Sequence, residues 1–211
     1  MLLNPKTKVI PTDHRDYPEW HYGRQQFALW YIEITDVALL EYLQYLRQLF
    51  SEFLYQPNER QFHITLFICG FLTEQLPALN DDFSLNLLQT QLKYLKQKPL
   101  VKFQLKTAQI NSFESALFLE VDDSTSVLNQ YRQILSQHSN EIAPLNYCPH
   151  ITLGLYREAF SVQQILQKIA QIEQQNFSFD VEQLTFGCYQ ASQLQGTLSA
   201  HTQIQLGSSS C

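Results

Sequence analysis

Short runs of branched and aromatic residues alternate along the chain with stretches in which apolar residues recur near the helical period. Residues 27–34 are almost continuously apolar, which predicts a largely buried strand. Leucines at 39, 43, 46 and 49 then recur at helical spacing, and Asp36 is placed to cap that helix. Strands that alternate with helices predict a mixed α and β fold.

The rest of the chain continues this alternation. Helices are predicted after Ser84, after Asp123 or Ser124, and after Ser161, which begins a capping-box pattern with a glutamine three residues later. Residues 1–26 show no period, so we expect an irregular arm that packs Trp20 or Tyr22 on the body. Further strands are predicted around the histidines at 63 and 150 and at residues 101–106, 116–121, 179–189 and 202–206.

One tetrapeptide occurs twice, as His63-Ile64-Thr65-Leu66 and as His150-Ile151-Thr152-Leu153. In a strand, successive side chains point to opposite faces, so each His shares a face with its Thr, and the Ile shares the other face with the Leu. The same offset of 87 residues (150 − 63) aligns Tyr31-Ile32-Glu33-Ile34 with Phe118-Leu119-Glu120-Val121. Self-similarity at one fixed offset indicates an internal duplication.

The duplication predicts how the chain is organised. We expect one domain over residues 1–211, with the arm at 1–26 and two pseudo-symmetric lobes at 27–110 and 111–206. If the halves pack about a pseudo-two-fold axis, both motif strands face one groove. Two sheets with helices outside would bury the isoleucines and leucines of the motifs, and the His and Thr faces would line the groove.

Composition and charge limit the kinds of molecule that the protein is expected to bind. The chain of 211 residues is 45% hydrophobic, enough for a sizeable core, and only 16% charged, with a net charge of −6. This balance argues against a protein that grips long duplex nucleic acid through many phosphates. No secretory signal and no membrane-length apolar run is visible, so we expect a cytoplasmic monomer without membrane contact.

The cysteines give little support for a metal. Cys69, Cys148, Cys188 and Cys211 have no C-x-x-C spacing, which predicts neither a zinc knuckle nor a redox dithiol. Zinc held by the two motif histidines with Cys69 or Cys148 is the alternative. The usual spacings of metal ligands are absent, so we expect no metal.

The repeated His and Thr suit phosphoryl chemistry. A single His-x-Thr is more often an ordinary strand segment, but two matched copies favour a shared site. Histidine titrates near neutral pH, so one imidazole can accept a proton while the other donates one. Each threonine hydroxyl lies on the same face and can donate to a phosphate oxygen.

The segments Phe62-His63-Ile64-Thr65-Leu66 and Pro149-His150-Ile151-Thr152-Leu153-Gly154 resemble the paired His-x-Thr motifs of the two-histidine (2H) phosphoesterase superfamily, which includes bacterial RNA 2′,5′-ligases and cyclic nucleotide phosphodiesterases. The resemblance spans residues 27–206. It implies a duplicated, bilobal α+β fold with two antiparallel sheets around a V-shaped groove. It also implies metal-free catalysis without a cofactor, with His63 and His150 as catalytic residues and Thr65 and Thr152 as phosphate-binding residues.

We therefore expect a metal-independent phosphoesterase acting on 2′,3′-cyclic or 2′,5′-linked RNA ends or on a related small cyclic phosphate. The alternative is a binding module that recognises an RNA end or nucleotide in the same groove without turnover. Phe67 and Tyr156 lie at even spacing from their histidines, which predicts that they face the groove and stack on a base, although core packing explains them equally well. Trp30 is expected in the core.

Overall fold

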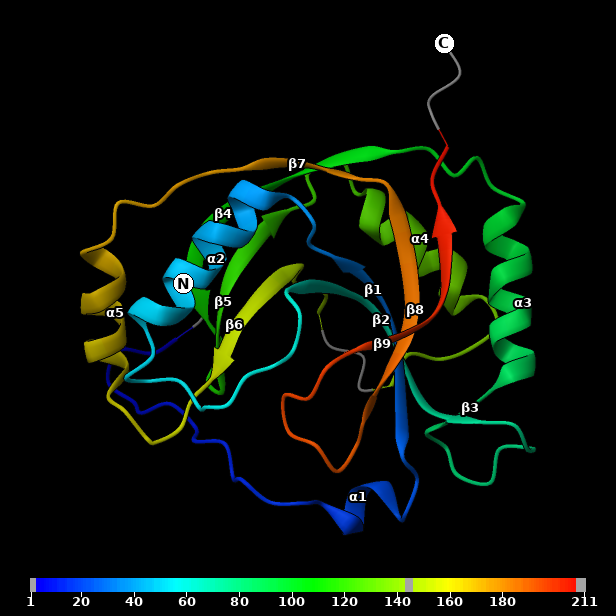
Figure 1. Ribbon diagram of the computed structural model, residues 1–211, viewed down its shortest axis with the longest axis horizontal. Helices are drawn as coiled ribbons and strands as arrows, with labels where there is room; N and C mark the ends of the chain where they lie inside the picture. Colours follow the sequence, from blue (N-terminus) through cyan, green and yellow to red (C-terminus); the bar gives the residue numbers. More distant parts are fainter. Residues whose placement is uncertain (1–2, 143–145, 208–211) are drawn as a thin grey trace.

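The two motif strands lie side by side at the centre of one curled sheet (Figure 1). The computed structural model describes residues 3–142 and 146–207, so Cys211 and the first two residues of the arm lie outside it. The strand order is β7-β4-β5-β6-β2-β1-β8-β9, and the short β3 pairs parallel to β2. The strands are β1 (Gln26–Glu33), β2 (His63–Thr73), β3 (Asp82–Ser84), β4 (Phe103–Ser112), β5 (Ala116–Asp122), β6 (His150–Leu155), β7 (Ser178–Val181), β8 (Gln183–Gln190) and β9 (Ser199–Gln205).

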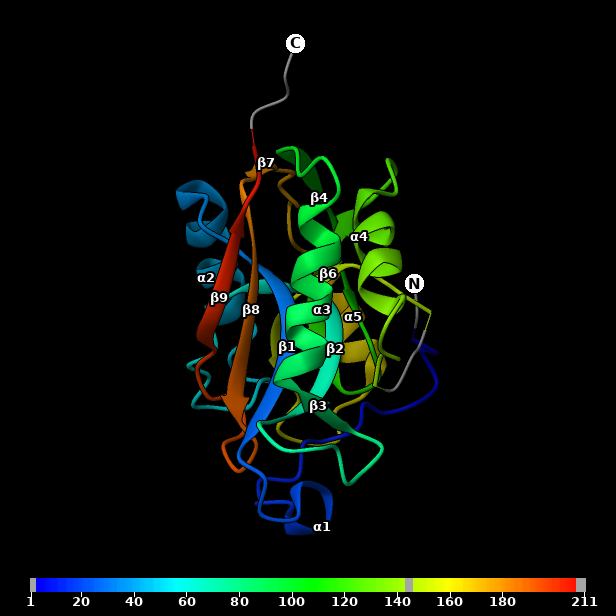
Figure 2. The ribbon, with the colours of Figure 1, turned by 90° about the vertical axis from the view of Figure 1, so that its right-hand side faces the viewer.

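Helices cover the outside of this sheet (Figures 1 and 2). We call β1, β2, β3, β8 and β9 the first lobe and β4 to β7 the second lobe. α3 and α4 lie on the first lobe, and α2 and α5 on the second. The helices are α1 (Pro18–His21), α2 (Val37–Leu49), α3 (Leu85–Lys96), α4 (Val127–Ser136) and α5 (Val162–Ala170). In the described part of the chain, no helix combines the length and the apolarity needed to cross a membrane.

The expected fold class is confirmed. The chain is α+β, and its strands curl into one sheet that is antiparallel apart from the β2–β3 pair, with the helices outside. The two expected sheets are continuous with one another, because Ile64 of β2 pairs with Ile151 of β6. These residues are separated by the duplication offset, 151 − 64 = 87, so the junction relates equivalent positions of the two halves.

The lobes are not consecutive halves of the chain. The expected division between residues 110 and 111 falls inside β4, which pairs with β5 and β7 of the second lobe. The predicted strand 179–189 divides at Glu182 into β7 and β8, and β8 returns to pair with β1. Hydrophobic periodicity shows which face of a strand is buried but not which strand it pairs with. The sequence therefore did not show that β7 and β8 belong to different lobes.

The helix starts predicted from capping residues agree with the structure better than the predicted division into lobes does. The side chains of Asp36 and Ser84 each accept a hydrogen bond from the backbone N–H three residues on, as expected of helix caps. Ser161 forms the predicted capping box at the start of α5. α4 begins at Val127, and Asp123 accepts a hydrogen bond from an N–H of its first turn.

The N-terminal arm is fixed to the first lobe near its end. The Trp20 ring packs against Phe27 and Phe71, with ring centroids 5.0 Å apart in both cases, which confirms its predicted packing. Arg24 then forms ion pairs of 2.6 and 2.7 Å with Asp81 and Asp82 at the start of β3. Because these groups are largely buried, this end of the arm is packed firmly on the first lobe.

A buried polar contact joins the first lobe to its helices. The Trp30 indole N–H of β1 donates to the Gln91 side chain of α3 over 2.8 Å. The Gln91 amide in turn donates to the Leu135 carbonyl of α4 over 2.9 Å. Trp30 and Gln91 have no exposed surface, so each group depends on the other for its hydrogen bond.

Replacing Gln91 by Ala is expected to lower the free energy of unfolding by about 2–4 kcal/mol, because the buried indole N–H loses its acceptor and a cavity remains. Urea denaturation measures the change. Gln89→Ala is the matched control, since Gln89 is exposed on the same helix. Equal losses for the two variants would contradict this account of the contact.

Candidate active site

Each motif strand carries a β-bulge directly after its threonine. In β2, Tyr31 of β1 pairs with Thr65 and Trp30 pairs with Phe67, so Leu66 is the additional residue. In β6 the same irregularity makes Leu153 the additional residue. The bulges lie at equivalent positions, 153 − 66 = 87, and each reverses the alternation of faces for the residues that directly follow it.

The bulges correct the predicted positions of two aromatic residues. Phe67 is 1% exposed and Tyr156 has no exposed surface, and both belong to the main hydrophobic core. The Tyr156 hydroxyl forms a 2.6 Å hydrogen bond with that of Ser112. The prediction that these rings face the groove is wrong, because even spacing keeps a residue on one face only in a regular strand. Ile68 and Leu155, both half-buried, take the groove-facing positions instead.

Arginines bind the carbonyl groups that the bulges leave free. Arg132 of α4 donates to the Leu66 carbonyl over 2.6 Å, and Arg47 of α2 donates to the Leu153 carbonyl over 2.9 Å. Each guanidinium also lies 3.9 Å from the centre of an aromatic ring, Tyr147 for Arg132 and Phe62 for Arg47. Both bulges are therefore held by charge-assisted hydrogen bonds from buried or half-buried helix residues.

The two histidines are oriented in the same way. His63 Nδ1 lies 2.7 Å from the Gln61 carbonyl, and His150 Nδ1 lies 2.7 Å from the Cys148 carbonyl. A carbonyl oxygen only accepts hydrogen bonds, so Nδ1 carries the proton in each neutral ring. The Nε2 atom of each ring is left unprotonated and is able to accept a proton.

The register brings the repeated side chains together. Because Ile64 pairs with Ile151 in antiparallel sense, His63 comes opposite Thr152 and Thr65 comes opposite His150. The two histidines are then diagonal neighbours, which in a regular antiparallel pair lie about 7–8 Å apart. All four side chains are half-buried on the inner face. Among the described residues, neither threonine hydroxyl forms a hydrogen bond, so both remain available to a ligand.

Aromatic side chains that the sequence analysis did not single out stand beside the histidines. The Tyr31 ring lies edge-on to His63 with centroids 5.7 Å apart. Phe118 and Phe113 lie against His150, with centroids 5.0 Å apart in each case. Tyr31 and Phe118 correspond through the 87-residue offset, and that alignment was the available signal, because each pairs across the sheet with a motif threonine.

Burial and charge keep the imidazoles neutral. Burial lowers the pKa of His63 to about 4, and the positive charges of Arg60, His150 and Arg47 add to the effect against the hydrogen bond to Gln61. Burial also lowers the pKa of His150. In the ligand-free protein both rings are therefore uncharged at neutral pH.

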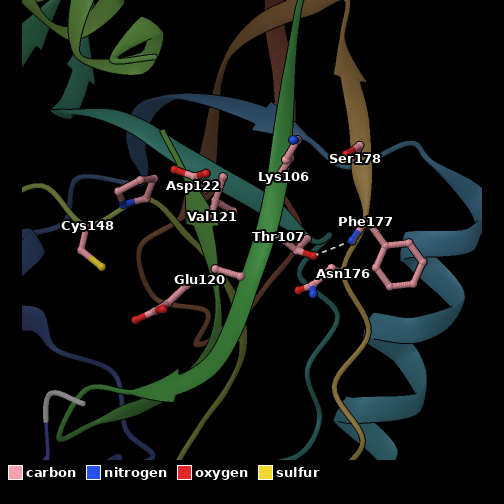
Figure 3. A pocket seen from close by; sticks show the side chains of 11 residues that line it. Lys106, Thr107, Glu120, Val121, Asp122, Cys148, Asn176, Phe177 and Ser178 are labelled. Carbon is pink, nitrogen blue, oxygen red and sulfur yellow. Dashed lines mark hydrogen bonds between the residues drawn. The ribbon is translucent and has the colours of Figure 1, made fainter. Parts of the chain in front are cut away.

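A hollow of about 620 Å³ opens beside the second motif strand (Figure 3). Glu120, which pairs with His150 across the sheet, lines it together with Cys148. The Asn111 amide donates to the Glu120 carboxylate over 2.6 Å and fixes its position. Lys106 and Asn176 contribute further polar groups from β4 and from the segment before β7, so the hollow offers both donors and acceptors.

The zinc alternative does not fit the cysteine positions. Cys69 is 3% exposed within the main core, on the other side of β2 from His63. Across residues 3–142 and 146–207, no three His, Cys, Asp or Glu side chains are grouped as metal ligands would be. Cys69 is therefore not placed to join His63 and His150 in the zinc site that the alternative requires.

The family model of the 2'-5' RNA ligase superfamily matches residues 36–193, which include both motif strands. The chain belongs to this superfamily. The matched range also contains both bulges and both arginines that bind them. A search of curated protein sequences finds no match.

Solved structures with the fold of the 2'-5' RNA ligase superfamily resemble the chain over most of its length. LigT of E. coli in complex with 3'-AMP has a TM-score of 0.59 at 16% identity, and the match covers 86% of this chain and 98% of LigT. TT0787 of Thermus thermophilus has a TM-score of 0.57 at 11% identity, covering 87% of this chain and 100% of TT0787. At these identities the likeness concerns the fold.

Replacing His63 by Asn is expected to make stability less sensitive to acid. The folded pKa of about 4 lies below the ordinary 6.5, so between these values the unfolded chain binds a proton that the folded chain does not. The wild-type free energy of unfolding should therefore fall as the pH drops through this window. Urea unfolding at about pH 7 and about pH 5 measures the loss, which should be smaller in the variant.

His201→Asn is the control for this experiment, because His201 is exposed on β9. It should keep the acid sensitivity of the wild type. The same loss in His63→Asn as in the wild type would show that His63 is not held neutral by the fold.

Proposed function

We propose that this protein is a metal-independent phosphoesterase that acts on 2′,3′-cyclic or 2′,5′-linked RNA ends, or on a related small cyclic phosphate. The observation that carries the proposal is the junction of β2 and β6, which sets two imidazoles and two hydroxyls on one half-buried surface. Both imidazoles have Nδ1 occupied by a carbonyl, so both Nε2 atoms are free for proton transfer. This is the set of groups that acid–base hydrolysis of a phosphate ester requires.

The reaction divides between the two histidines. One imidazole accepts a proton from water as the water oxygen bonds to phosphorus. The other imidazole, protonated, gives its proton to the ribose oxygen as the bond from phosphorus to that oxygen breaks. The hydroxyls of Thr65 and Thr152 donate to the oxygens of phosphorus that do not leave, where negative charge gathers. Water is consumed, one P–O bond forms and one breaks, and the histidines end with their protonation states exchanged.

The surroundings of the two histidines suit a nucleotide. Phe113 is half-buried beside His150 and offers a ring on which a base can stack. The hollow next to Glu120 has donors and acceptors for ribose hydroxyls or a base edge. Structures of E. coli LigT, which resembles this chain in fold, have been solved with 3'-AMP and with ATP, and this supports a small nucleotide as the ligand.

Replacing His63 or His150 by Ala is expected to reduce hydrolysis of a 2′,3′-cyclic nucleotide by about 10²–10⁴-fold, because each variant lacks one of the two proton-transfer groups. Product formation is followed by chromatography in the presence of a strong chelator. His201→Ala, an exposed histidine on β9, should retain wild-type turnover. Undiminished turnover in a folded His63→Ala or His150→Ala variant would refute the proposal.

The same assay separates the alternative of a binding module. If a panel of cyclic nucleotides and 2′,5′-linked oligonucleotides binds the wild-type protein but yields no product, the groove recognises these ligands without turnover. Loss of activity on adding the chelator would instead point to a metal-dependent reaction.

The pH dependence should be bell-shaped, because one imidazole must be neutral and the other protonated. Both pKa values are lowered in the free protein, so kcat/KM, which reports the free enzyme, should be greatest at a pH below about 6.5. A bound phosphate anion raises the pKa of a neighbouring imidazole, so kcat should be greatest at a higher pH. Coincident optima for kcat and kcat/KM would contradict this electrostatic account.

A further inference from the structure

Arg60 is a half-buried cation that forms no ion pair with any carboxylate of the described residues. Its Nε–H donates to the Gly196 carbonyl over 2.9 Å, and its guanidinium lies 4.0 Å from the centre of the Tyr189 ring. Arg24 and Arg132, which are similarly enclosed, are each paired with acidic side chains. Burial lowers the pKa of Arg60, so its surroundings disfavour the charge that it carries. A bound anion would compensate the positive charge of Arg60 and so stabilise it.

The guanidinium lies on the groove side of the first lobe. Tyr189 of β8 pairs with Phe27 of β1, on the same face of β1 as Tyr31, which contacts the His63 ring. Phe27 and Tyr31 are four residues apart, about 13 Å along a strand. The charge of Arg60 still contributes to lowering the pKa of His63. Arg60 is therefore near the reacting groups but is displaced along the groove from the His and Thr pairs.

The loop that carries Arg60 is held in place on both sides. The Gln61 side chain exchanges two hydrogen bonds with the backbone of Leu198, of 2.9 and 2.8 Å. The Gln61 carbonyl also accepts the hydrogen bond from His63. Gln195, 6% exposed, reaches the carbonyls of Tyr55 and Pro57. The position of the guanidinium is thus fixed relative to His63 before any ligand binds.

We propose that Arg60, backed by the Tyr189 ring, binds a second phosphate of the substrate, the 5′ phosphate of the ribose whose 2′,3′-cyclic phosphate reacts. This inference rests on the proposed function. The planar guanidinium fork matches phosphate oxygens, and its two terminal nitrogens have no carboxylate partner in the part of the chain that the structure describes. The preferred substrate class is then a 5′-phosphorylated nucleotide or an RNA terminus, in which the next phosphate takes this place, and not a nucleoside cyclic monophosphate.

The test compares adenosine 2′,3′-cyclic phosphate with its 5′-phosphorylated form. The wild-type protein should favour the 5′-phosphorylated substrate in kcat/KM by about 10- to 100-fold, the range for a charge-assisted pair of hydrogen bonds. Arg60→Gln should lose this preference, because its kcat/KM should fall much further on the 5′-phosphorylated substrate than on the unphosphorylated one. Arg60→Lys keeps the charge without the fork and should recover part of the preference.

Arg15→Gln is the matched control, because it changes the net charge equally on the exposed arm and should keep the wild-type preference. An equal fall of Arg60→Gln on both substrates would overturn the inference, since Arg60 would then act on the reacting phosphate or on the fold. No preference in the wild type would overturn it too. If Arg60→Gln does not fold, Arg60→Lys decides the test through a weakened preference.

Binding separates this inference from the proposed function. Calorimetric titration with adenosine 3′,5′-bisphosphate and adenosine 3′-phosphate needs no turnover. Tighter binding of the bisphosphate by the wild type and not by Arg60→Gln would support the second phosphate subsite even if no substrate were hydrolysed. Equal affinity of the wild type for both nucleotides would overturn the subsite even if hydrolysis occurred.

Discussion

The antiparallel contact between Ile64 and Ile151 is the constraint on which the rest of the structure depends. It joins two lobes into one sheet, and it fixes which side chains of β2 meet which of β6. A slip of one residue in either strand would turn its His and Thr into the core and its isoleucine into the groove. The hydrophobic burial of the isoleucines and leucines therefore also determines where the two histidines and the two threonines stand. Packing and site geometry have the same physical origin here.

The bulges make this register specific. A bulge frees a carbonyl from the sheet, and a buried carbonyl without a donor is costly, so the strand is stable only where a donor can reach it. Arg47 of α2 and Arg132 of α4 are those donors. Each helix follows a strand of one lobe and lies on the other, so each arginine fixes the motif strand of the lobe on which its helix packs. The exchange of helices between lobes thus links the two halves of the site to one another.

How much of this could be predicted from the sequence follows from the range of each interaction. The repeated tetrapeptide, the cap at Asp36 and the capping box at Ser161 depend on near neighbours, and the structure contains them. The bulge was not visible, because Leu66 and Phe67 are both apolar and a buried run has no alternation in which a shift would appear. Phe67 and Tyr156 were misplaced for that reason. The return of β8 to β1 and the approach of Gly196 to Arg60 join distant segments, which no local pattern reports.

Duplication alone gives two equivalent histidines, whereas acid–base chemistry needs two unequal ones. The two histidines differ because the residues around them are not the same in the two halves. The position equivalent to Arg60 in the second half, 60 + 87 = 147, is Tyr147, which carries no positive charge and packs under Arg132. The charge of Arg60 therefore acts on His63 and has no counterpart at His150. Asn111 distinguishes the second half in turn. Glu33 is the equivalent of Glu120 and pairs with His63 as Glu120 pairs with His150, but Thr185, which pairs with Tyr31 as Asn111 pairs with Phe118, offers no amide to hold it. The duplication sets the spacing of the two histidines, and the residues that differ between the halves make their surroundings unequal, as the proposed acid–base reaction requires.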